Sequence, residues 1–432
     1  MLSGECRADP SANHRVNHPM HAFTICARNY LGYALTCREA FERAMPGQRL
    51  TIFLADDPLD ASEQIEDLVD IAALGLPGLW DMALRYSVLE FSTAIKAACF
   101  QYLFEREGAS EVVYLDPDIF LLAPLDAVRD AFDAGAPAMV TPHISGPIPD
   151  ELAPTDMDIL RSGIYNLGFL ALSRCEPVDR FLQWWAKRLR EYCYNDAPHG
   201  LFVDQRLADF IPSFLPGTRI LNHPGYNLAY WNLHERPVTL GGTGLLAAGE
   251  PVSFVHFSGV VPGNPSVFSK HQSRHSVDSI GAPLRELLES YLDALARNGQ
   301  ARWSGIPYGF GRFSDGVSLP DCARRALAAS QPAPATSRDE AFRPQHDVLN
   351  AQSTRIDPDP SAPVSLLMHA IYDQRPDLQG QFPLATAKGR AGFLRWFLRH
   401  GAREYRLDER FLEPAHKARG INGLVSRTLA RR

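Results

Sequence analysis

In the first two thirds of the chain, short apolar runs alternate with longer segments whose hydrophobic residues recur at helical spacing. The runs at 21–27, 50–55 and 112–115 are apolar on both faces, a pattern typical of strands inside a covered, mostly parallel sheet. Residues 33–45 have helical spacing and predict, with the first two runs, a βαβ unit with parallel pairing. The same patterns predict strands at 138–141, 164–173 and 252–257, and helices at 61–73, 88–106, 178–192 and 283–298.

Composition divides the chain into five predicted parts. Residues 1–20 are polar and are predicted to be a flexible leader, and residues 21–313 form an α/β domain. Residues 314–362 are rich in Ala, Pro, Ser and Asp, which is typical of a linker. Residues 363–413 predict a small helical appendage, which is too short to be very stable unless it packs against another part of the chain or a partner. Residues 414–432 form a basic tail.

Charge, cysteine content and hydropathy argue against several classes of protein for this chain. The net charge of −7 over 432 residues gives no sign of a nucleic-acid partner. The seven cysteines are scattered without a Cys-x-x-Cys pair, which favours reduced thiols over a disulfide or zinc framework. No stretch reaches the ~18 apolar residues of a membrane span, and the leader lacks the apolar core of a signal peptide. We therefore expect a cytoplasmic protein; the alternative is peripheral contact of the basic tail with anionic lipid on the inner face of the membrane.

The most informative stretch is the strand at 112–115 with the Asp116-Pro117-Asp118 sequence that follows it. Proline cannot donate a hydrogen bond to a neighbouring strand, so pairing is expected to stop there. Two carboxylates then lie beyond the carboxyl end of a strand, where open α/β sheets bind ligands. Such oxygen ligands suit Mg²⁺ or Mn²⁺. The alternative is an ordinary turn with two solvated aspartates.

Further polar residues stand beside apolar runs, and each has an ordinary structural interpretation as well. Asp57 follows the second strand and either receives ribose hydroxyls or begins a helix. Lys96 lies within a predicted helix that packs near the acid pair, where a lysine is usually solvated. Asn166 interrupts an apolar run and is either a satisfied core amide or a substrate contact.

Three later features complete the candidate site. Asp204 and Gln205 either cap a helix or offer a carboxylate and an amide to a sugar. The loop at 224–231 combines aromatic rings with an amide, a composition that suits carbohydrate faces and also fills cores. His256 ends a strand and is either structural or a third metal ligand beside the two aspartates.

Over residues 21–273 these motifs resemble the retaining nucleotide-sugar glycosyltransferases of the A-type fold, the glycogenin and lipopolysaccharide galactosyltransferase family (family 8). The Val-Val-Tyr-Leu-Asp-Pro-Asp-Ile sequence is similar to the family's strand running into a metal-binding Asp-x-Asp. Tyr165-Asn-Leu-Gly resembles its Phe-Asn-x-Gly, Asp204-Gln205 its Asp-Gln pair, and His256-Phe-Ser-Gly its His-Phe-x-Gly. The family's Lys-Pro-Trp after this last segment is missing, so Lys270 or Arg274 is expected to substitute for the lysine that grips the donor diphosphate.

The resemblance implies an A-type, Rossmann-like catalytic domain over 21–313 and a role for each matching residue. The metal ligands are Asp116, Asp118 and His256, and the catalytic residues are Gln205, Asp204 and Asn166. The donor is held by Asn29, Tyr30, Asp57, Lys96, Asp116, Gly259 and Lys270.

The implied activity is transfer of a sugar from a nucleotide-diphospho-sugar to an acceptor hydroxyl, with retention and with Mn²⁺ or Mg²⁺. A UDP-sugar is the favoured donor, with dTDP- or GDP-sugars as alternatives. The acceptor is a glycan, a lipid-linked glycan or a protein. The resemblance does not assign a role to the appendage, for which holding the acceptor and making homo-oligomers both stay open. Two other classes stay open: a non-catalytic sugar or nucleotide binder, and a phosphatase with an aspartyl nucleophile.

Overall fold

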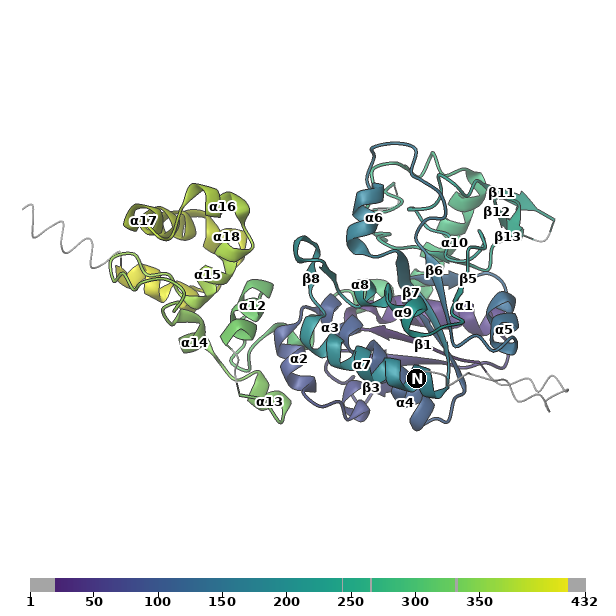
Figure 1. The fold of residues 1–432 in the computed structure, drawn as a ribbon, viewed down its shortest axis with the longest axis horizontal. Helices are drawn as coiled ribbons and strands as arrows, with labels where there is room; N and C mark the ends of the chain where they lie inside the picture. Colours follow the sequence, from purple (N-terminus) through teal and green to yellow (C-terminus); the bar gives the residue numbers. More distant parts are fainter. Residues whose placement is uncertain (1–19, 243, 265, 331–332, 419–432) are drawn as a thin grey trace, which may run out of the picture. The chain divides into compact units, whose positions relative to one another are not determined.

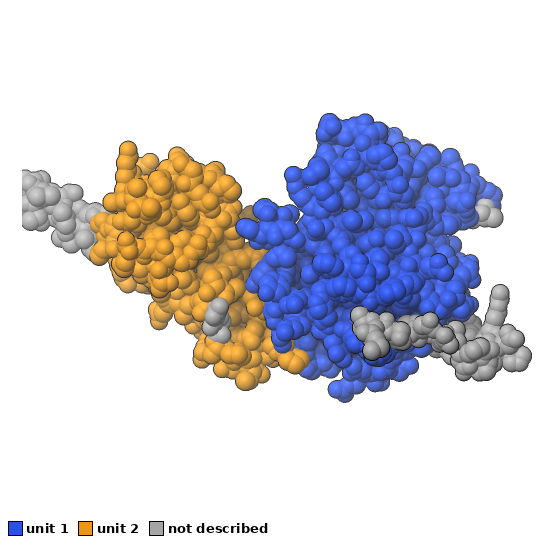
Figure 2. Space-filling view, in the orientation of Figure 1, with its two compact units in different colours: residues 1–76, 88–308 blue, residues 77–87, 309–432 orange. Residues whose placement is uncertain are grey.

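The computed structural model describes residues 20–242, 244–264, 266–330 and 333–418. The chain forms two compact units, one of residues 1–76 and 88–308 and the other of residues 77–87 and 309–432 (Figure 2). Residues 1–19 of the predicted leader and residues 419–432 of the predicted basic tail lie outside the described residues. In the part of the chain that is described, no helix combines the length and the apolar character that a membrane crossing requires.

The first unit is built on a seven-stranded sheet with the order β10-β6-β7-β4-β1-β2-β3 (Figure 1). Four neighbouring pairs are parallel, whereas β7 runs antiparallel to both β4 and β6. The predicted α/β class with a mostly parallel central sheet is therefore confirmed. The strands are β1 (His21–Cys26), β2 (Leu50–Leu54), β3 (Leu68–Asp70), β4 (Glu111–Leu115), β6 (Ala138–Pro142), β7 (Tyr165–Ser173) and β10 (Arg219–Ile220).

Alternate residues of the central strands face two different helical layers, as expected for strands buried on both faces. On one face, the ring of Phe23 lies 4.8 Å from that of Phe100 on α4 (Lys96–Glu105). On the other face, Ala22 and Ile52 share a core with buried residues of α1 (Leu31–Ala44) and α10 (Ala282–Arg297). The continuous apolar runs in the sequence follow from this two-sided burial.

The remaining elements of this unit surround the sheet. The helices are α3 (Val88–Ala94), α5 (Asp126–Asp133), α6 (Asp156–Ser162), α7 (Glu176–Tyr192), α8 (Gln205–Ala208), α9 (Ile211–Phe214) and α11 (Gln300–Trp303). The short strands are β5 (Ile119–Leu121), β8 (Asn195–Asp196), β9 (Leu201–Phe202), β11 (Val238–Gly241), β12 (Gly244–Ala247), β13 (Glu250–Pro251) and β14 (Phe254–His256).

Two predicted elements differ from the structure. The helix expected at 61–73 is wrong, because Leu68 pairs with Ile52 and makes β3 the edge of the parallel sheet. Asp70 then accepts a hydrogen bond from the backbone N–H of Ala72 and begins a short 3₁₀ helix. The single helix expected at 88–106 is divided into α3 and α4 at Ile95.

The second unit is helical, and its helices include residues predicted as a linker. The buried guanidinium of Arg324 on α12 donates to the carbonyl oxygens of Ala83 and Leu84, which joins the 77–87 segment to this unit. Residues 314–362 contain α12 to α14. The first of these helices is rich in alanine, and the second is capped by Ser337, whose side chain accepts from the backbone N–H of Glu340. The helices are α2 (Leu79–Arg85), α12 (Asp321–Ser330), α13 (Arg338–Ala341), α14 (His346–Asn350), α15 (Leu366–Asp373), α16 (Pro376–Gln381), α17 (Ala387–Trp396) and α18 (Ala402–Glu404).

The cysteines agree only in part with the expectation of reduced thiols. Cys26, Cys37, Cys99, Cys193 and Cys322 are free and buried. Cys175 takes part in a disulfide, so the expectation is wrong for this residue.

Candidate active site

The acid pair and the histidine converge because of one antiparallel strand pairing. β4 ends at Leu115, and the backbone N–H of Asp116 makes a last hydrogen bond to the carbonyl of Gly168 at 2.8 Å. The chain turns through Pro117 into β5, which pairs with β14 so that His256 lies opposite Ile119. The backbone N–H of Phe257 donates to the carbonyl of Asp118 at 2.9 Å. The turn and the strand end are thus fixed against each other.

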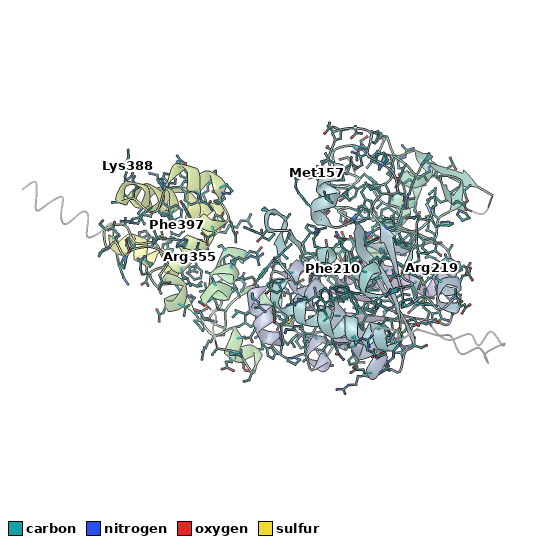
Figure 3. All side chains as sticks on the ribbon, viewed as in Figure 1. Met157, Phe210, Arg219, Arg355, Lys388 and Phe397 are labelled. Atoms are coloured by element: carbon teal, nitrogen blue, oxygen red, sulfur yellow. The ribbon has the colours of Figure 1, made fainter. Side chains whose placement is uncertain are left out.

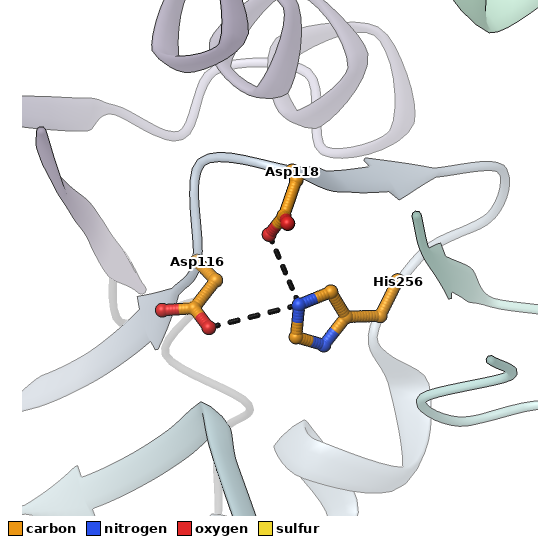
Figure 4. Close-up of side chains that lie close together, drawn as sticks. All are labelled: Asp116, Asp118 and His256. Carbon is orange, nitrogen blue, oxygen red and sulfur yellow. Dashed lines mark ion pairs between the residues drawn. The ribbon is translucent and has the colours of Figure 1, made fainter. Parts of the chain in front are cut away.

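In this geometry one nitrogen faces two carboxylates (Figure 4). Nε2 of His256 lies 3.0 Å from an oxygen of Asp118 and 3.6 Å from an oxygen of Asp116. One ligand atom from each residue can be chosen so that all three lie within 4.8 Å of one another. His256 is buried, whereas the carboxylates of Asp116 and Asp118 remain 30% and 18% exposed. Two oxygen ligands and one imidazole with open positions suit Mn²⁺ or Mg²⁺, so the residues present fit such an ion.

The three side chains shift one another's protonation. Burial raises the pKa of Asp116, although Lys96 and His256 act in the opposite direction. Burial would also raise the pKa of Asp118, but its ion pair and hydrogen bond with His256 lower it. Burial opposes protonation of His256, and the attraction of the two carboxylates outweighs it and raises the pKa of the ring. Without a metal, these shifts favour a protonated His256 beside an ionised Asp118.

A pocket of about 570 Å³ opens beside these residues. Six of the predicted site residues line it, together with aromatic and imidazole rings from other parts of the chain. Helix α6 contributes part of the wall, and its Met157 is exposed (Figure 3). The predicted site residues in the lining are Lys96, Asp116, Asn166, Asp204, Gln205 and His256, and the other rings are His143, Phe202, Tyr230, Trp231 and His271.

Lys96 and Asp204 form a buried ion pair within this lining. The ammonium nitrogen lies 2.5 Å from a carboxylate oxygen, and the two side chains are 1% and 2% exposed. Lys96 also donates to the carbonyl of Leu167 at 2.9 Å and lies 3.9 Å above the ring of Tyr114. Burial raises the pKa of Asp204, and the charge of Lys96 opposes that effect. Lys96 thus neutralises Asp204 in addition to any contact with a donor.

The side-chain amides of Asn166 and Gln205 make hydrogen bonds to other groups of the protein. Gln205 accepts from the backbone N–H of Leu167 at 3.1 Å and donates to the carbonyl of Ser162 at 2.8 Å. Asn166 accepts from the backbone N–H of Gly168 at 3.1 Å, and its nitrogen lies 3.2 Å from Nε2 of His143. Both amides are therefore held rigidly in the wall of the pocket.

The residues expected at the nucleoside end occupy a neighbouring region. Tyr30 is 40% exposed, and its ring stacks on that of Tyr33 with centroids 4.6 Å apart. Burial, together with the charge of Asp118, raises the pKa of Tyr30 to about 12. The carbonyl of Asn29 accepts from the side chain of Gln300 at 2.9 Å.

The acids after β2 have different environments. Asp57 is half-buried and does not line the pocket. Asp56 is buried and accepts from the backbone N–H of Arg28 at 3.0 Å, so it fixes the start of the following turn.

The two cations expected to replace the missing lysine also differ. Lys270 is exposed, and its backbone N–H donates to the carbonyl of Gly259 at 3.0 Å. Arg274 pairs with Asp150 at 2.7 Å and lowers the pKa of that carboxyl to about 2. Arg274 also donates to the carbonyls of Leu152 and Pro154, so it secures a loop. Of the two, Lys270 is the one whose charge is available to a ligand.

The sequence did not indicate His143 as a site residue. Burial lowers the pKa of His143 to about 4, so the ring is neutral. It follows a strand within a polar, proline-containing stretch, and no local pattern marks it. The sequence indicates Asn227 only as part of an aromatic loop, yet this residue is fully buried and contacts both Asn166 and His256.

Comparison with known proteins gives structural similarity alone. No family model matches the chain, and no curated protein matches it. Galactosyltransferase LgtC in complex with donor and acceptor sugar analogues is 13% identical over 64% of this chain and 96% of its own, with a TM-score of 0.39.

Two further solved structures are also glycosyltransferases, each 13% identical to this chain. An active-site mutant of LgtC has a TM-score of 0.38 over 64% of this chain and 96% of its own. A glycosyltransferase involved in glycosylation of the major capsid of PBCV-1 has a TM-score of 0.34 over 55% of this chain and 93% of its own. At these scores, the activity has to be argued from the site itself.

Proposed function

We propose that the chain is a metal-dependent glycosyltransferase that moves a sugar from a nucleotide-diphospho-sugar to an acceptor hydroxyl. The observation that supports this most is the meeting of Asp116, Asp118 and His256 beside a pocket of about 570 Å³ that Asp116 and His256 line. A pair of carboxylates with one imidazole leaves coordination positions for phosphate oxygens. The pocket has the volume expected of a small-molecule site.

Different residues of the site would bind the nucleoside diphosphate and the sugar of the donor. When bound, the ion would supply Lewis-acid stabilisation of charge on the leaving nucleoside diphosphate. Tyr30 offers an exposed aromatic face to the base, and Lys270 an exposed charge to the phosphates. Asn166 and Gln205, fixed by their backbone hydrogen bonds, give the sugar a rigid polar wall.

The environment of Asp204 bears on the stereochemistry. A covalent nucleophile would need a free carboxylate beside the anomeric carbon, but Asp204 is paired with Lys96 at 2.5 Å. We therefore favour retention by attack on the same face, with the leaving phosphate as the base. The acceptor hydroxyl must then lie about 3 Å from the anomeric carbon.

The donor and acceptor are proposed at the level of chemical class. We favour a UDP-sugar, with dTDP- and GDP-sugars as the competing donors, and a glycan, lipid-linked glycan or protein as acceptor. The site assignment of Asn29, Asp57 and Gly259 to donor binding is part of the same proposal. Gly259 has φ +76°, and a Cβ there would lie 2.5 Å from His271, so the position requires glycine.

A donor panel with and without Mn²⁺ tests the proposal. The correct nucleotide-sugar should raise the melting temperature of the full chain only when Mn²⁺ is present. Mass spectrometry should detect the nucleoside diphosphate that is released as the sugar passes to water in place of an acceptor. Asp118→Asn should abolish both effects, whereas Asp133→Asn, an exposed acid at the end of α5, should retain them.

Two outcomes separate the alternatives. Metal-dependent donor binding without release of product would favour a non-catalytic binder, and release of phosphate from a simple phosphomonoester would favour a phosphatase. Absence of any metal-dependent donor binding would reject the proposed site.

A further inference from the structure

Asn227 is fully buried and makes three side-chain hydrogen bonds at the back of the candidate metal site. Its Nδ2 lies 2.8 Å from Oγ1 of Thr141 and 3.0 Å from Oδ1 of Asn166. Its Oδ1 lies 3.2 Å from Nδ1 of His256. Each polar atom of this amide therefore has a partner, as a buried amide requires.

The direction of these hydrogen bonds follows from a backbone N–H, which can only donate. The N–H of Gly168 donates to one atom of the Asn166 amide, so that atom is the carbonyl oxygen. The atom of Asn227 beside this oxygen must then be its NH₂ group, and the other atom, facing His256, must be its oxygen. Because an amide oxygen only accepts, Nδ1 of His256 carries the hydrogen.

The remaining ring nitrogen of His256 is Nε2, which faces Asp118 and Asp116 at 3.0 and 3.6 Å. With the hydrogen held at Nδ1, the lone pair of the neutral ring lies on Nε2. Metal-bound histidines commonly donate their other ring N–H in this way, which fixes both tautomer and orientation. The ring of Trp231, 5.2 Å away and edge-on, restricts the imidazole further.

The backbone around Asn227 holds the amide at a fixed distance from the ring. The N–H of His256 donates to the carbonyl of Leu228 at 2.8 Å, so the loop and β14 are hydrogen-bonded beside Asn227. Asn227 itself has a φ of 57°, a left-handed conformation that asparagine and glycine adopt more readily than other residues.

We propose that Asn227 is a positioning residue that sets His256 as a metal ligand by holding its Nδ1–H tautomer and its ring plane. This inference rests on the proposed function, because it takes the Asp116, Asp118 and His256 group as a divalent-metal site. Asn227 itself does not line the pocket, and its side chain contacts Thr141, Asn166 and His256.

Mn²⁺ alone, without nucleotide-sugar, is the probe for the test. Titration of the full chain is followed by the electron paramagnetic resonance signal of free Mn²⁺. Asn227→Gly removes the amide while tolerating the positive φ, and should weaken Mn²⁺ binding by about 10- to 100-fold, the usual effect of losing a ligand's supporting partner.

Thr141→Val is the matched control. It also removes a buried hydrogen-bond partner of Asn227, but leaves the contacts from Asn166 through Asn227 to His256 in place. Its Mn²⁺ affinity should stay within about twofold of the wild type, even though the protein loses some thermal stability.

Nitrogen NMR of the histidine rings provides a readout of the tautomer. With diamagnetic Mg²⁺ bound, the ring signal that disappears in His256→Gln should show its hydrogen on Nδ1 in the wild type and a mixture of tautomers in Asn227→Gly. Unchanged Mn²⁺ affinity in Asn227→Gly, or an equal loss in Thr141→Val, would overturn the inference.

The result also separates this inference from the proposed function. If Asn227→Gly weakens Mn²⁺ binding and no nucleotide-sugar is ever turned over, the positioning role stands and the transferase proposal fails. If the wild type binds neither Mn²⁺ nor Mg²⁺, both are overturned.

Discussion

The ammonium nitrogen of Lys96 and a carboxylate oxygen of Asp204 lie 2.5 Å apart, in side chains that are 1% and 2% exposed. This pair joins the start of α4 to the residue before α8, across more than a hundred residues of sequence. Both residues line the pocket, so the pair is part of its wall. The charge of Asp204 in this wall is therefore neutralised by Lys96, and removing either partner would affect folding as well as binding.

Lys96→Met should lower the free energy of unfolding by about 3–5 kcal/mol, because Asp204 is left as an unpaired buried charge. Urea denaturation measures the change. The double variant Lys96→Met with Asp204→Leu should be more stable than Lys96→Met alone, because it removes the isolated charge.

An exposed pair on α7 supplies the control for that experiment. Arg180 and Glu176 form an ion pair with exposed fractions of 48% and 68%, and Arg180→Ala should change stability by less than about 1 kcal/mol. If Lys96→Met were as mild as Arg180→Ala, the buried pair would not contribute in the way described.

Gly168→Ala should disable metal binding more than folding. A Cβ at this position would lie 2.4 Å from Cε1 of His256 and 2.8 Å from an oxygen of Asp116, so both ligands must move. We expect Mn²⁺ affinity, measured by calorimetry, to fall at least about tenfold, the lower end of the losses caused by disturbed ligand positioning. Gly263→Ala, where an added Cβ meets nothing within 4 Å, should bind Mn²⁺ like the wild type. Equal affinities for the two variants would contradict the close packing at Gly168.

The parts of the site that could be predicted from sequence are those set by local chain chemistry. An apolar strand followed by Asp-Pro-Asp marks both the end of β4 and the acid pair at its edge. The pattern also located His256 at the end of an apolar run, although its proximity to Asp118 depends on β14 pairing with β5.

The parts that could not be predicted depend on non-local pairing. The register of β6 and β7 shifts between Val140 and Thr141, which places Thr141 opposite Asn166. Only this juxtaposition gives Asn227 two acceptors for its NH₂ group. No hydrophobic periodicity indicates such a shift in register, so the hydrogen bonds from Asn166 through Asn227 to His256 could not be predicted from the sequence. The edge strand β3 is missed for a different reason, because its three residues are too few to show an alternation of apolar and polar positions.

The stability of the folded chain should depend on the titration of His143. Burial lowers the pKa of His143 from its ordinary value of 6.5 to about 4, so the unfolded chain binds this proton more readily than the folded chain. The stabilising contribution is thus complete above about pH 6.5 and is lost as the pH falls toward 4, by up to roughly 3 kcal/mol. Urea unfolding of wild type and His143→Gln at several pH values isolates this contribution, because both chains carry the same carboxylates. A constant difference between them from pH 7 to pH 4 would contradict it.

Tyr30→Ala should weaken nucleotide-sugar binding without affecting metal binding. The ring is 40% exposed and is backed by Tyr33, with centroids 4.6 Å apart and planes 17° apart, so one aromatic face is presented in a fixed orientation. Stacking of a base on such a ring contributes about 1–3 kcal/mol, and calorimetry in Mn²⁺ should therefore show a rise in Kd of about 5- to 150-fold. Tyr30→Phe keeps the ring and should bind the donor almost normally, as should Tyr192→Ala, which removes a tyrosine of similar exposure on α7. If Tyr30→Ala bound the donor as tightly as Tyr192→Ala does, the base would have to lie elsewhere, and the assignment of the 28–30 turn to the nucleoside would be wrong.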